Sequence, residues 1–264
     1  MPKFSLITVC KNAAPALQRT LYSAKQQTFA DYEHIVIDGG STDNTFKVLA
    51  EYKDYIDKVI SEPDTGVYNA MNKGIRLAGG GYLLFLNAGD IFLHENVLHM
   101  VAEQLTRKTV DVFFGHTLSL DRVTGKAFIR TQLPYVNRLT LWGSTIAHQA
   151  AFINRRAFAE IGLYEESFQI LADYEWFCRA IIIHNCSCQY YDFVPVVYGL
   201  DGLSSAPANS DIAKRAWQER RIIRQKYYNK LGLLVYQNDF FYWKFLRLNV
   251  FIYKVWKKLR RKEK

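Results

Sequence analysis

Five aspartates of this chain stand beside predicted strand ends or helix starts, where side chains with chemical roles commonly lie. They are Asp38, Asp43, Asp64, Asp90 and Asp173. Carboxylates hold Mg²⁺ or Mn²⁺ against a diphosphate, because the ion takes one or two protein oxygens and completes its shell with phosphate and water. We therefore expect a site for a diphosphate and a divalent cation, with Asp90 as the protein ligand.

Two common phosphate-binding patterns are missing from the sequence. No G-x-x-x-x-G-K-[ST] segment occurs, and no G-x-G-x-x-G segment follows the first predicted strand. The first pattern marks P-loop proteins, and the second opens the folds that bind nicotinamide or flavin dinucleotides. The sequence therefore favours neither class.

The first 90 residues alternate between short apolar runs and helical patterns. In chain order we expect a strand at 4–9, a helix at 16–27, a strand at 34–38, a helix from Thr42 or Asp43 to about 52, a strand at 58–61, a helix from Asp64 or Thr65 to 78, and a strand at 82–87. Such alternation predicts an α/β fold with a Rossmann-like, mostly parallel sheet flanked by helices. Ligands of such sheets bind beyond the carboxyl ends of the strands, where Asp38 and Asp90 fall.

The middle of the chain is less regular. Two apolar runs at 110–120 and 126–131 flank residues 121–125, which predicts a β-hairpin. Residues 150–162 are typical of a strand followed by a helix that stops at a glycine. Residues 172–183 predict a helix whose first turn carries acidic side chains.

The positive charge of the chain lies near its carboxyl end. The whole sequence has a net charge of +9, but residues 214–264 hold 16 Lys or Arg and 3 Asp or Glu, a net of +13. Residues 1–213 hold 18 and 22, a net of −4. A uniformly basic domain that binds nucleic acid would not divide in this way. We therefore expect a body at 1–210, a basic aromatic extension at 211–264, and no nucleic-acid partner.

Residues 240–262 of this extension predict an amphipathic helix with a basic sector and an aromatic and aliphatic remainder. Charged residues interrupt the segment too often for a transmembrane span. We expect the helix to lie on the anionic face of a membrane, because aromatic side chains beside a basic stripe suit the headgroup region. The alternative is a helix whose apolar face packs on the body.

The cysteines and the first residues indicate a reducing compartment. Cys10, Cys178, Cys186 and Cys188 do not form the paired spacing of a zinc site or a disulfide framework, so we expect reduced thiols. Met1-Pro2-Lys3 leads directly into a strand, without the pattern of a secretory signal. The expected location is the cytoplasm, at the inner face of the plasma membrane.

Six segments together resemble a known family: ITVCKNA, IVIDGGSTDNT, SEPDTGVYNAMNKGI, YLLFLNAGD, AHQAAF and ADYEWFCR. In this order and spacing they are similar to the family 2 inverting glycosyltransferases, which have the GT-A fold. The resemblance covers roughly residues 3–205, and its nearest subgroup assembles bacterial surface polysaccharides on a lipid carrier. It implies a nucleotide-sugar half at about 1–115 and an acceptor half at about 116–210.

The resemblance also implies an activity. A hexose-type sugar would pass from a nucleotide sugar, preferably a UDP-sugar, to a lipid-linked saccharide, with Mn²⁺ or Mg²⁺ on the diphosphate. Inverting transfer is one displacement at the anomeric carbon, so a base must take the proton of the attacking hydroxyl. A metal ion would hold the charge that develops on the leaving diphosphate.

Position by position, the resemblance assigns roles to single residues. Asp173, six residues before Arg179, matches the catalytic base, and Asp90 matches a metal ligand. From their residue types, His148 and Trp142 are expected on the acceptor or phosphate side, although an interior histidine is an alternative for His148 and a core position is an alternative for Trp142. The residues that would contact the nucleotide sugar are Thr8, Asp38 at the base, Asp64, Asn72, Lys73 and Asn87.

The sequence departs from the family pattern at three positions. Asn87 and Gly89 stand where the family usually has the aspartates of its metal-binding motif, and Met71 stands where many members have arginine. These departures leave open a catalytically silent relative that acts as an assembly partner. The basic extension leaves open a nucleic-acid-binding protein.

Overall fold

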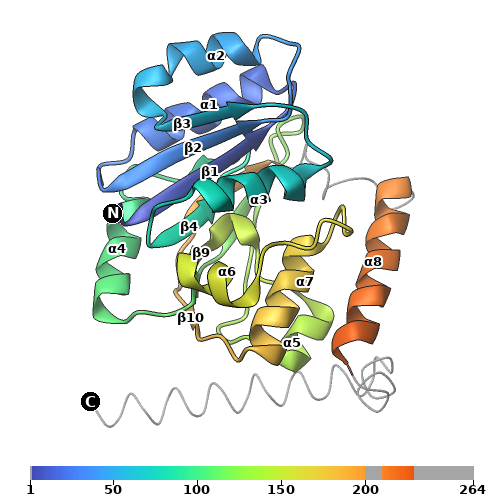
Figure 1. Cartoon of the computed structure of the whole chain (residues 1–264). Helices are drawn as coiled ribbons and strands as arrows, with labels where there is room; N and C mark the ends of the chain where they lie inside the picture. The colour runs from blue at the N-terminus through green and yellow to red at the C-terminus, as the bar shows by residue number, and fades with distance from the viewer. Residues whose placement is uncertain (1, 200–209, 229–264) are drawn as a thin grey trace.

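The computed structural model describes residues 2–199 and 210–228 (Figure 1). Its elements follow one another as β1 (Phe4–Cys10), α1 (Ala14–Lys25), β2 (Tyr32–Asp38), α2 (Thr45–Glu51), β3 (Lys58–Ser61), α3 (Val67–Leu77), β4 (Tyr82–Phe85), β5 (Ile91–Phe92), α4 (Val97–Arg107), β6 (Val112–Phe114), β7 (Thr117–Leu120), β8 (Ala127–Arg130), α5 (Arg138–Gly143), β9 (Ala151–Asn154), α6 (Arg155–Ile161), α7 (Ala172–Cys178), β10 (Cys188–Tyr190), β11 (Val196–Gly199) and α8 (Asp211–Tyr227). Short helical turns lie at Lys53–Tyr55, His148–Ala150 and Arg179–Ile183. The predicted α/β class is confirmed.

The main sheet has the strand order β10-β6-β9-β4-β1-β2-β3. Strands β1 to β4 pair in parallel, whereas β9 runs antiparallel to both β4 and β6. Because β9 is reversed, its amino end lies at the same edge of the sheet as the carboxyl ends of the parallel strands. This edge collects residues from distant parts of the chain.

Successive side chains of the central strands point to opposite faces of the sheet and pack against different helices. Ile7 and Val9 of β1 pack with helices α3, α6 and α7, whereas Phe4 and Leu6 pack on the face that α4 covers. Helices α1 and α2 cover the same side farther along, around Leu17 and neighbouring apolar residues. Strands buried on both faces explain why the sequence shows continuous apolar runs there.

The predicted hairpin forms between β7 and β8, but the run 110–120 is not one strand. It divides at Gly115 into β6 of the main sheet and β7 of a smaller sheet with the order β5-β11-β7-β8. A Cβ atom at Gly115 would lie 2.6 Å from the ring of Phe193, so only glycine allows this close approach. The chain thus changes sheets at a position that the apolar pattern does not mark.

Several helix boundaries differ from the predicted ones: α1 begins and ends two residues earlier, at Ala14 and Lys25, and α2 begins at Thr45. Helix α3 begins after Gly66, whose φ of +148° lies in the region that favours glycine, and no side chain caps it. Helix α7 ends at Cys178 and continues as a π-helical turn over Arg179–Ile183. The expected helix at 172–183 therefore exists in two parts with different hydrogen bonding.

Helix α8 runs beside α7 along one side of the molecule (Figure 1). It belongs to the segment that the sequence assigns to the extension, yet Ile223, Tyr227 and Tyr228 are part of the main core. The predicted helix at 240–262 lies outside the described residues. Within the described ranges, none of the helices has the length and apolar character that crossing a membrane requires.

Candidate active site

Asp173 and His148 meet at the edge of the sheet where β9 begins. Asp173 is the second residue of α7, and His148 lies in the turn directly before β9. His148 Nδ1 is 2.8 Å from Asp173 Oδ2. The Tyr68 hydroxyl, from the first turn of α3, is 2.9 Å from Asp173 Oδ1. Three separate elements therefore converge on one carboxylate.

The surroundings of Asp173 favour its charged form. The residue is only 8% exposed, and its Oδ1 atom also accepts a hydrogen bond of 2.8 Å from the Tyr174 N–H. Burial acts to raise the pKa of Asp173, but the hydrogen bond and charge of His148, together with the donors Tyr68 and Tyr174, lower it below the ordinary value. Asp173 is thus an anion held by donors on both oxygens.

The second acid of α7 has a different environment. Glu175 is fully buried and accepts hydrogen bonds from Lys226 at 2.9 Å, from the Tyr227 hydroxyl and from Arg179 at 3.1 Å. Arg179 also donates to the carbonyl oxygens of Ile161 and Leu163. Glu175 therefore joins α7 to α8 and to the loop after α6, and it is Asp173 that faces the edge of the sheet.

A tight turn follows β4 and carries Asn87 and Asp90. The Asp90 N–H donates to the Asn87 carbonyl oxygen at 2.9 Å. Thr20 of α1 fixes this turn, because its hydroxyl donates to the Asp90 carbonyl oxygen at 2.8 Å and accepts from the Gly89 N–H at 2.9 Å. Arg122, from the β7–β8 hairpin, donates to the Gly89 carbonyl oxygen. The roles of Thr20 and Arg122 could not be predicted from the sequence, since their partners lie far away along the chain.

The oxygens of this turn fit a divalent cation that is bound together with a diphosphate. Asn87 Oδ1 is buried and has no hydrogen-bond partner among the described residues, and Asp90 adds a carboxylate three positions later. Within residues 2–199 and 210–228, no cluster of three or more His, Cys, Asp or Glu side chains could hold a metal ion. A cation here would therefore take most of its ligands from phosphate and water.

Asp38 lies at the end of β2 and is completely buried. Its carboxylate accepts hydrogen bonds from the Ser41 N–H at 3.0 Å, from the Ser41 hydroxyl, and from the Ser61 hydroxyl at 2.6 Å. Burial acts to raise the pKa of Asp38, but these donors lower it. Asp38 thus fixes the turn after β2 and connects it to the end of β3.

Thr8 is fully buried within the sheet, two residues before the end of β1. Its hydroxyl donates to the Leu86 carbonyl oxygen at 2.8 Å and lies 2.9 Å from His34 Nε2. Burial lowers the pKa of His34 to about 4, so this imidazole is neutral near pH 7. The side chain of Thr8 therefore connects neighbouring strands, and its expected place in the wall of a pocket is not visible in the structure.

Asp64 lies in the loop before α3, and Lys73 lies on α3. Asp64 accepts from the Gly66 N–H at 3.2 Å, and a Cβ atom at Gly39 would lie 2.2 Å from Asp64 Oδ2. Lys73 forms an ion pair of 2.8 Å with Glu62 in the same loop. Asp64 and Lys73 thus border the loop that follows β3.

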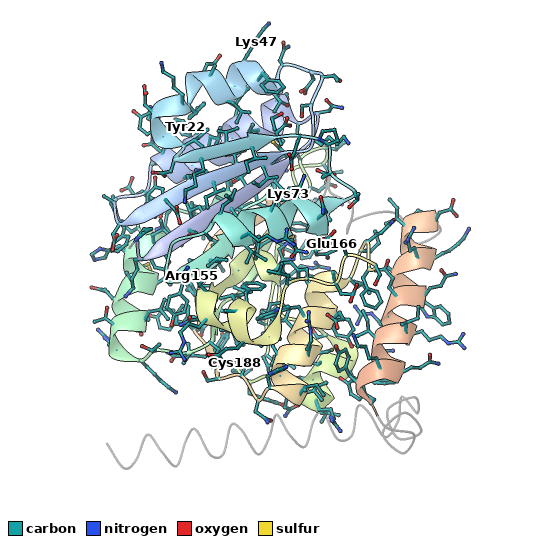
Figure 2. The ribbon with its side chains drawn as sticks, viewed as in Figure 1. Tyr22, Lys47, Lys73, Arg155, Glu166 and Cys188 are labelled. Atoms are coloured by element: carbon teal, nitrogen blue, oxygen red, sulfur yellow. The ribbon has the colours of Figure 1, made fainter. Side chains whose placement is uncertain are left out.

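Asn72 faces the loop after α6. It donates to the Tyr164 carbonyl oxygen at 2.9 Å and to Glu166 at 2.8 Å, and accepts from the Tyr164 N–H at 3.0 Å. Figure 2 shows Glu166 in this loop and Lys73 on α3, both in the central part of the molecule. The polar groups of Asn72 therefore hold the 164–166 segment, and its contact with the donor stays a prediction.

Trp142, expected on the acceptor side, is buried beneath α8. Its ring centroid is 5.1 Å from that of Tyr228 and 4.1 Å from the Arg224 guanidinium carbon. The ring is 6% exposed, because α8 covers it. Stacking against a sugar would require α8 to move, so Trp142 is a core residue in this structure.

Glu219 connects α8 directly to the start of α7. Its carboxylate accepts from the N–H groups of Gln169, Ile170 and Leu171 at 2.8, 3.0 and 2.9 Å. Backbone N–H groups of a loop that are withdrawn from water need such partners. Sequence analysis did not identify Glu219, although a lone acid among the basic residues of 214–238 is a signal for an internal partner.

The four cysteines are free thiols. Burial raises the pKa of Cys10, Cys178 and Cys188 to about 12 and that of Cys186 to about 11. Thiols of this kind are neutral at physiological pH and are weak nucleophiles and metal ligands. The expectation of reduced thiols agrees with these positions.

Among solved structures, the similar ones are glycosyltransferases. Staphylococcus aureus TarS 1–349 in complex with UDP-GlcNAc superimposes with a TM-score of 0.64 at 16% identity, over 89% of this chain and 76% of that one. The mannosyltransferase PcManGT from Pyrobaculum calidifontis, in complex with GDP-Man and Mn²⁺, has a TM-score of 0.57 at 18% identity, over 83% and 61%. This chain covers 45% of the longer TarS chain. These likenesses show that the fold is GT-A-like.

Two mycobacterial sequences show closer similarity. An uncharacterized glycosyltransferase of Mycobacterium tuberculosis is 37% identical over 185 residues, 69% of this chain and 70% of the relative. A PGL/p-HBAD biosynthesis glycosyltransferase of Mycobacterium bovis is 32% identical over 231 residues, 84% of this chain and 86% of the relative. Residues 5–162 match the family described as glycosyl transferase family 2. The chain therefore belongs to glycosyl transferase family 2 and is an enzyme that transfers a glycosyl group.

Proposed function

We propose that this enzyme moves a hexose-type sugar from a UDP-sugar to a lipid-linked saccharide, with inversion at the anomeric carbon, during synthesis of a bacterial cell-surface polysaccharide. The observation that carries the proposal is the buried, anionic Asp173, with His148 and Tyr68 on its two oxygens. An assembly partner without activity would not need a charged dyad at the ligand-binding edge of its sheet. Burying such a charge is costly unless it is paired.

The nucleotide would bind beyond the ends of β1, β2 and β3. Asp38 is fixed there by Ser41 and Ser61, and would meet the uracil base at the turn that these bonds hold. Lys73 and Asp64 border the neighbouring loop, on the side expected for the diphosphate. The complex of TarS with UDP-GlcNAc, a protein of similar fold, supports the choice of a UDP-sugar.

Asp90 and the unpartnered Asn87 Oδ1 would hold Mn²⁺ or Mg²⁺ at the diphosphate. When bound, the ion would supply positive charge to the leaving group. Arg122 brings a second positive charge to the same turn through its bond to the Gly89 carbonyl oxygen. The complex of PcManGT, a protein of similar fold, with GDP-Man and Mn²⁺ supports the choice of a divalent cation, and Arg122 would assist it.

The basic segment 240–262 supports an acceptor class and a location for the enzyme. A lipid-linked acceptor would present its sugar near the cytoplasmic membrane face, where the basic segment 240–262 would hold the enzyme. The mycobacterial relative is named a PGL/p-HBAD biosynthesis glycosyltransferase, which supports a role for this enzyme in a biosynthetic pathway. We expect a peripheral enzyme on the inner face of the plasma membrane.

A panel of nucleotide sugars tests the proposal. The full-length protein is incubated with UDP-, GDP- and dTDP-sugars and Mn²⁺, and the release of nucleoside diphosphate is measured with and without lipid-linked acceptors. We expect slow release from one UDP-sugar, and faster release when the acceptor is present. Inactivity with every donor would favour the silent relative, and retention on nucleic acid at 150 mM salt would favour a nucleic-acid-binding protein.

A further inference from the structure

The carboxylate of Asp173 has few free acceptor directions in this structure. Oδ1 accepts from the Tyr68 hydroxyl and the Tyr174 N–H, and Oδ2 faces His148 Nδ1 at 2.8 Å. Donors on both oxygens stabilise the anion and make it a weaker base. A sugar hydroxyl that approached Asp173 would compete with these three donors.

His148 offers an atom without this competition. Because Asp173 is an acceptor, the contact between them requires a proton on His148 Nδ1, and in the neutral imidazole this leaves a lone pair on Nε2. His148 Nε2 is buried and has no hydrogen-bond partner among the described residues. A carboxylate on Nδ1–H fixes this tautomer of an imidazole and stabilises the imidazolium that forms when Nε2 takes a proton.

We propose that His148 Nε2 takes the acceptor proton and that Asp173 orients and stabilises the imidazole. The inference rests on the proposed transferase function. In the step, the acceptor hydroxyl oxygen forms a bond with the anomeric carbon as the bond from that carbon to the diphosphate oxygen breaks. The electron pair of the broken bond leaves with the nucleoside diphosphate. The hydroxyl proton moves to Nε2, which gives an imidazolium beside the Asp173 carboxylate.

The arrangement of the chain supports this assignment. The reversed strand β9 pairs with β4 and β6 and so anchors the turn that carries His148. Tyr68 and Tyr164 are titratable groups that interact with Asp173. Burial, together with the charge of Asp173, raises the pKa of both tyrosines well above the ordinary value, so neither competes as a base.

The first test uses activity and its pH dependence. Hydrolysis of the donor selected by the panel serves as the assay, with water in place of the acceptor. His148→Gln should lower kcat about 10² to 10⁴-fold, the usual range for a general base. Imidazole added to His148→Ala should restore part of the rate. Wild-type kcat should fall toward acid pH, because a protonated Nε2 cannot take a second proton, and this limb should be absent in His148→Gln.

His99→Gln is the matched control, because His99 lies on α4 with an exposed side chain and should keep the wild-type rate. UDP affinity is measured in parallel. If His148→Gln lowers UDP affinity as much as it lowers kcat/KM, His148 is a phosphate contact and the proposal fails. An unchanged rate or an unchanged acid limb would also overturn it.

A second measurement does not depend on transfer. The ¹⁵N NMR shifts of the His148 ring should show Nδ1 protonated and Nε2 unprotonated in the wild-type protein, and this preference should weaken in Asp173→Asn. The opposite tautomer in the wild type would overturn the dyad even in an active enzyme. The expected tautomer in a protein that hydrolyses no donor would instead locate the failure in the proposed function.

Discussion

The Glu219 carboxylate of α8 accepts a hydrogen bond of 2.9 Å from the N–H of Leu171, two residues before Asp173. Glu219 and Leu171 are 48 positions apart in the chain. The same carboxylate also accepts hydrogen bonds from the N–H groups of Gln169 and Ile170. A helix that sequence analysis assigns to the extension therefore supports the loop that leads to the candidate catalytic residue.

Replacing Glu219 with Gln should weaken the start of α7. One amide oxygen cannot serve three N–H donors, and an unsatisfied buried donor costs about 1 to 3 kcal/mol. We expect a lower urea midpoint and a reduced kcat. Gln218→Ala, on the exposed side of the same helix, is the control. Equal midpoints for Glu219→Gln and the wild type would show that the bonds contribute little.

Replacing Asp173 with Asn keeps the size of the side chain but removes its charge. The variant should lower kcat about 10² to 10⁴-fold with little change in donor affinity, because the lost interaction acts on proton transfer. Steady-state kinetics and UDP binding measure the two effects separately. Asp211→Asn, at an exposed position on α8, should behave as wild type. Full activity of Asp173→Asn would remove Asp173 from the mechanism.

Removal of the metal should stop the reaction. We expect EDTA to abolish activity and Mn²⁺ or Mg²⁺ to restore it, and Asp90→Ala to weaken both UDP binding and turnover, because a cation bound with a diphosphate needs this carboxylate. Isothermal titration with UDP, with and without Mn²⁺, measures the coupling. Normal turnover after EDTA treatment would reject the metal, and Arg122→Gln would then test whether Arg122 alone supplies the charge.

Asp38 should contribute to donor binding, and it should also stabilise the folded protein in a way that depends on pH. Asp38→Asn should raise the KM for the donor and weaken inhibition by UDP. The pKa of Asp38 is lower in the folded protein than in the unfolded chain, so its stabilising effect is present above about pH 4 and is lost as the pH falls through the folded value. Urea unfolding of wild type and variant should therefore differ at pH 7 and converge toward pH 3. An unchanged UDP inhibition constant would limit Asp38 to fixing the turn.

Truncation after Tyr228 should separate membrane binding from catalysis. The shorter protein keeps α8 and its bonds to α7, so it should still hydrolyse the donor, but it should no longer sediment with anionic vesicles at low salt. Truncation after Ser210 removes Glu219 as well and should lose activity or solubility. Equal sedimentation of the full-length protein and the protein ending at Tyr228 would exclude a membrane role for the missing segment.

The local part of this fold could be predicted from the sequence. Strands such as Lys58–Ser61 and the position of Asp173 in the first turn of a helix follow from apolar runs, turn residues and charge within a few neighbours. The contact between His148 and Asp173 could not be predicted in this way. It depends on the direction of β9, which a strand of four residues does not encode.

The same limit applies to Arg122, Thr20 and Trp142. Each has its partner on an element that lies far away in the sequence, so its role depends on how whole layers pack. The residue type of Trp142 is compatible with an acceptor site and with a core position, because an aromatic ring is common in both. Only the position of α8 distinguishes the two.

The reversed direction of β9 has a consequence for how such enzymes can diverge. Residues 131–147 connect the β7–β8 hairpin to His148, while His148 itself is anchored through β9 to the main sheet. Helix α5 within this segment belongs to the main core through Leu139, Leu141 and Trp142, so only the residues before it, 131–134, can be lengthened, shortened or exchanged without disturbing the packing around the dyad. Natural variation and grafting experiments could thus change which acceptor is recognised while the reaction chemistry is inherited unaltered.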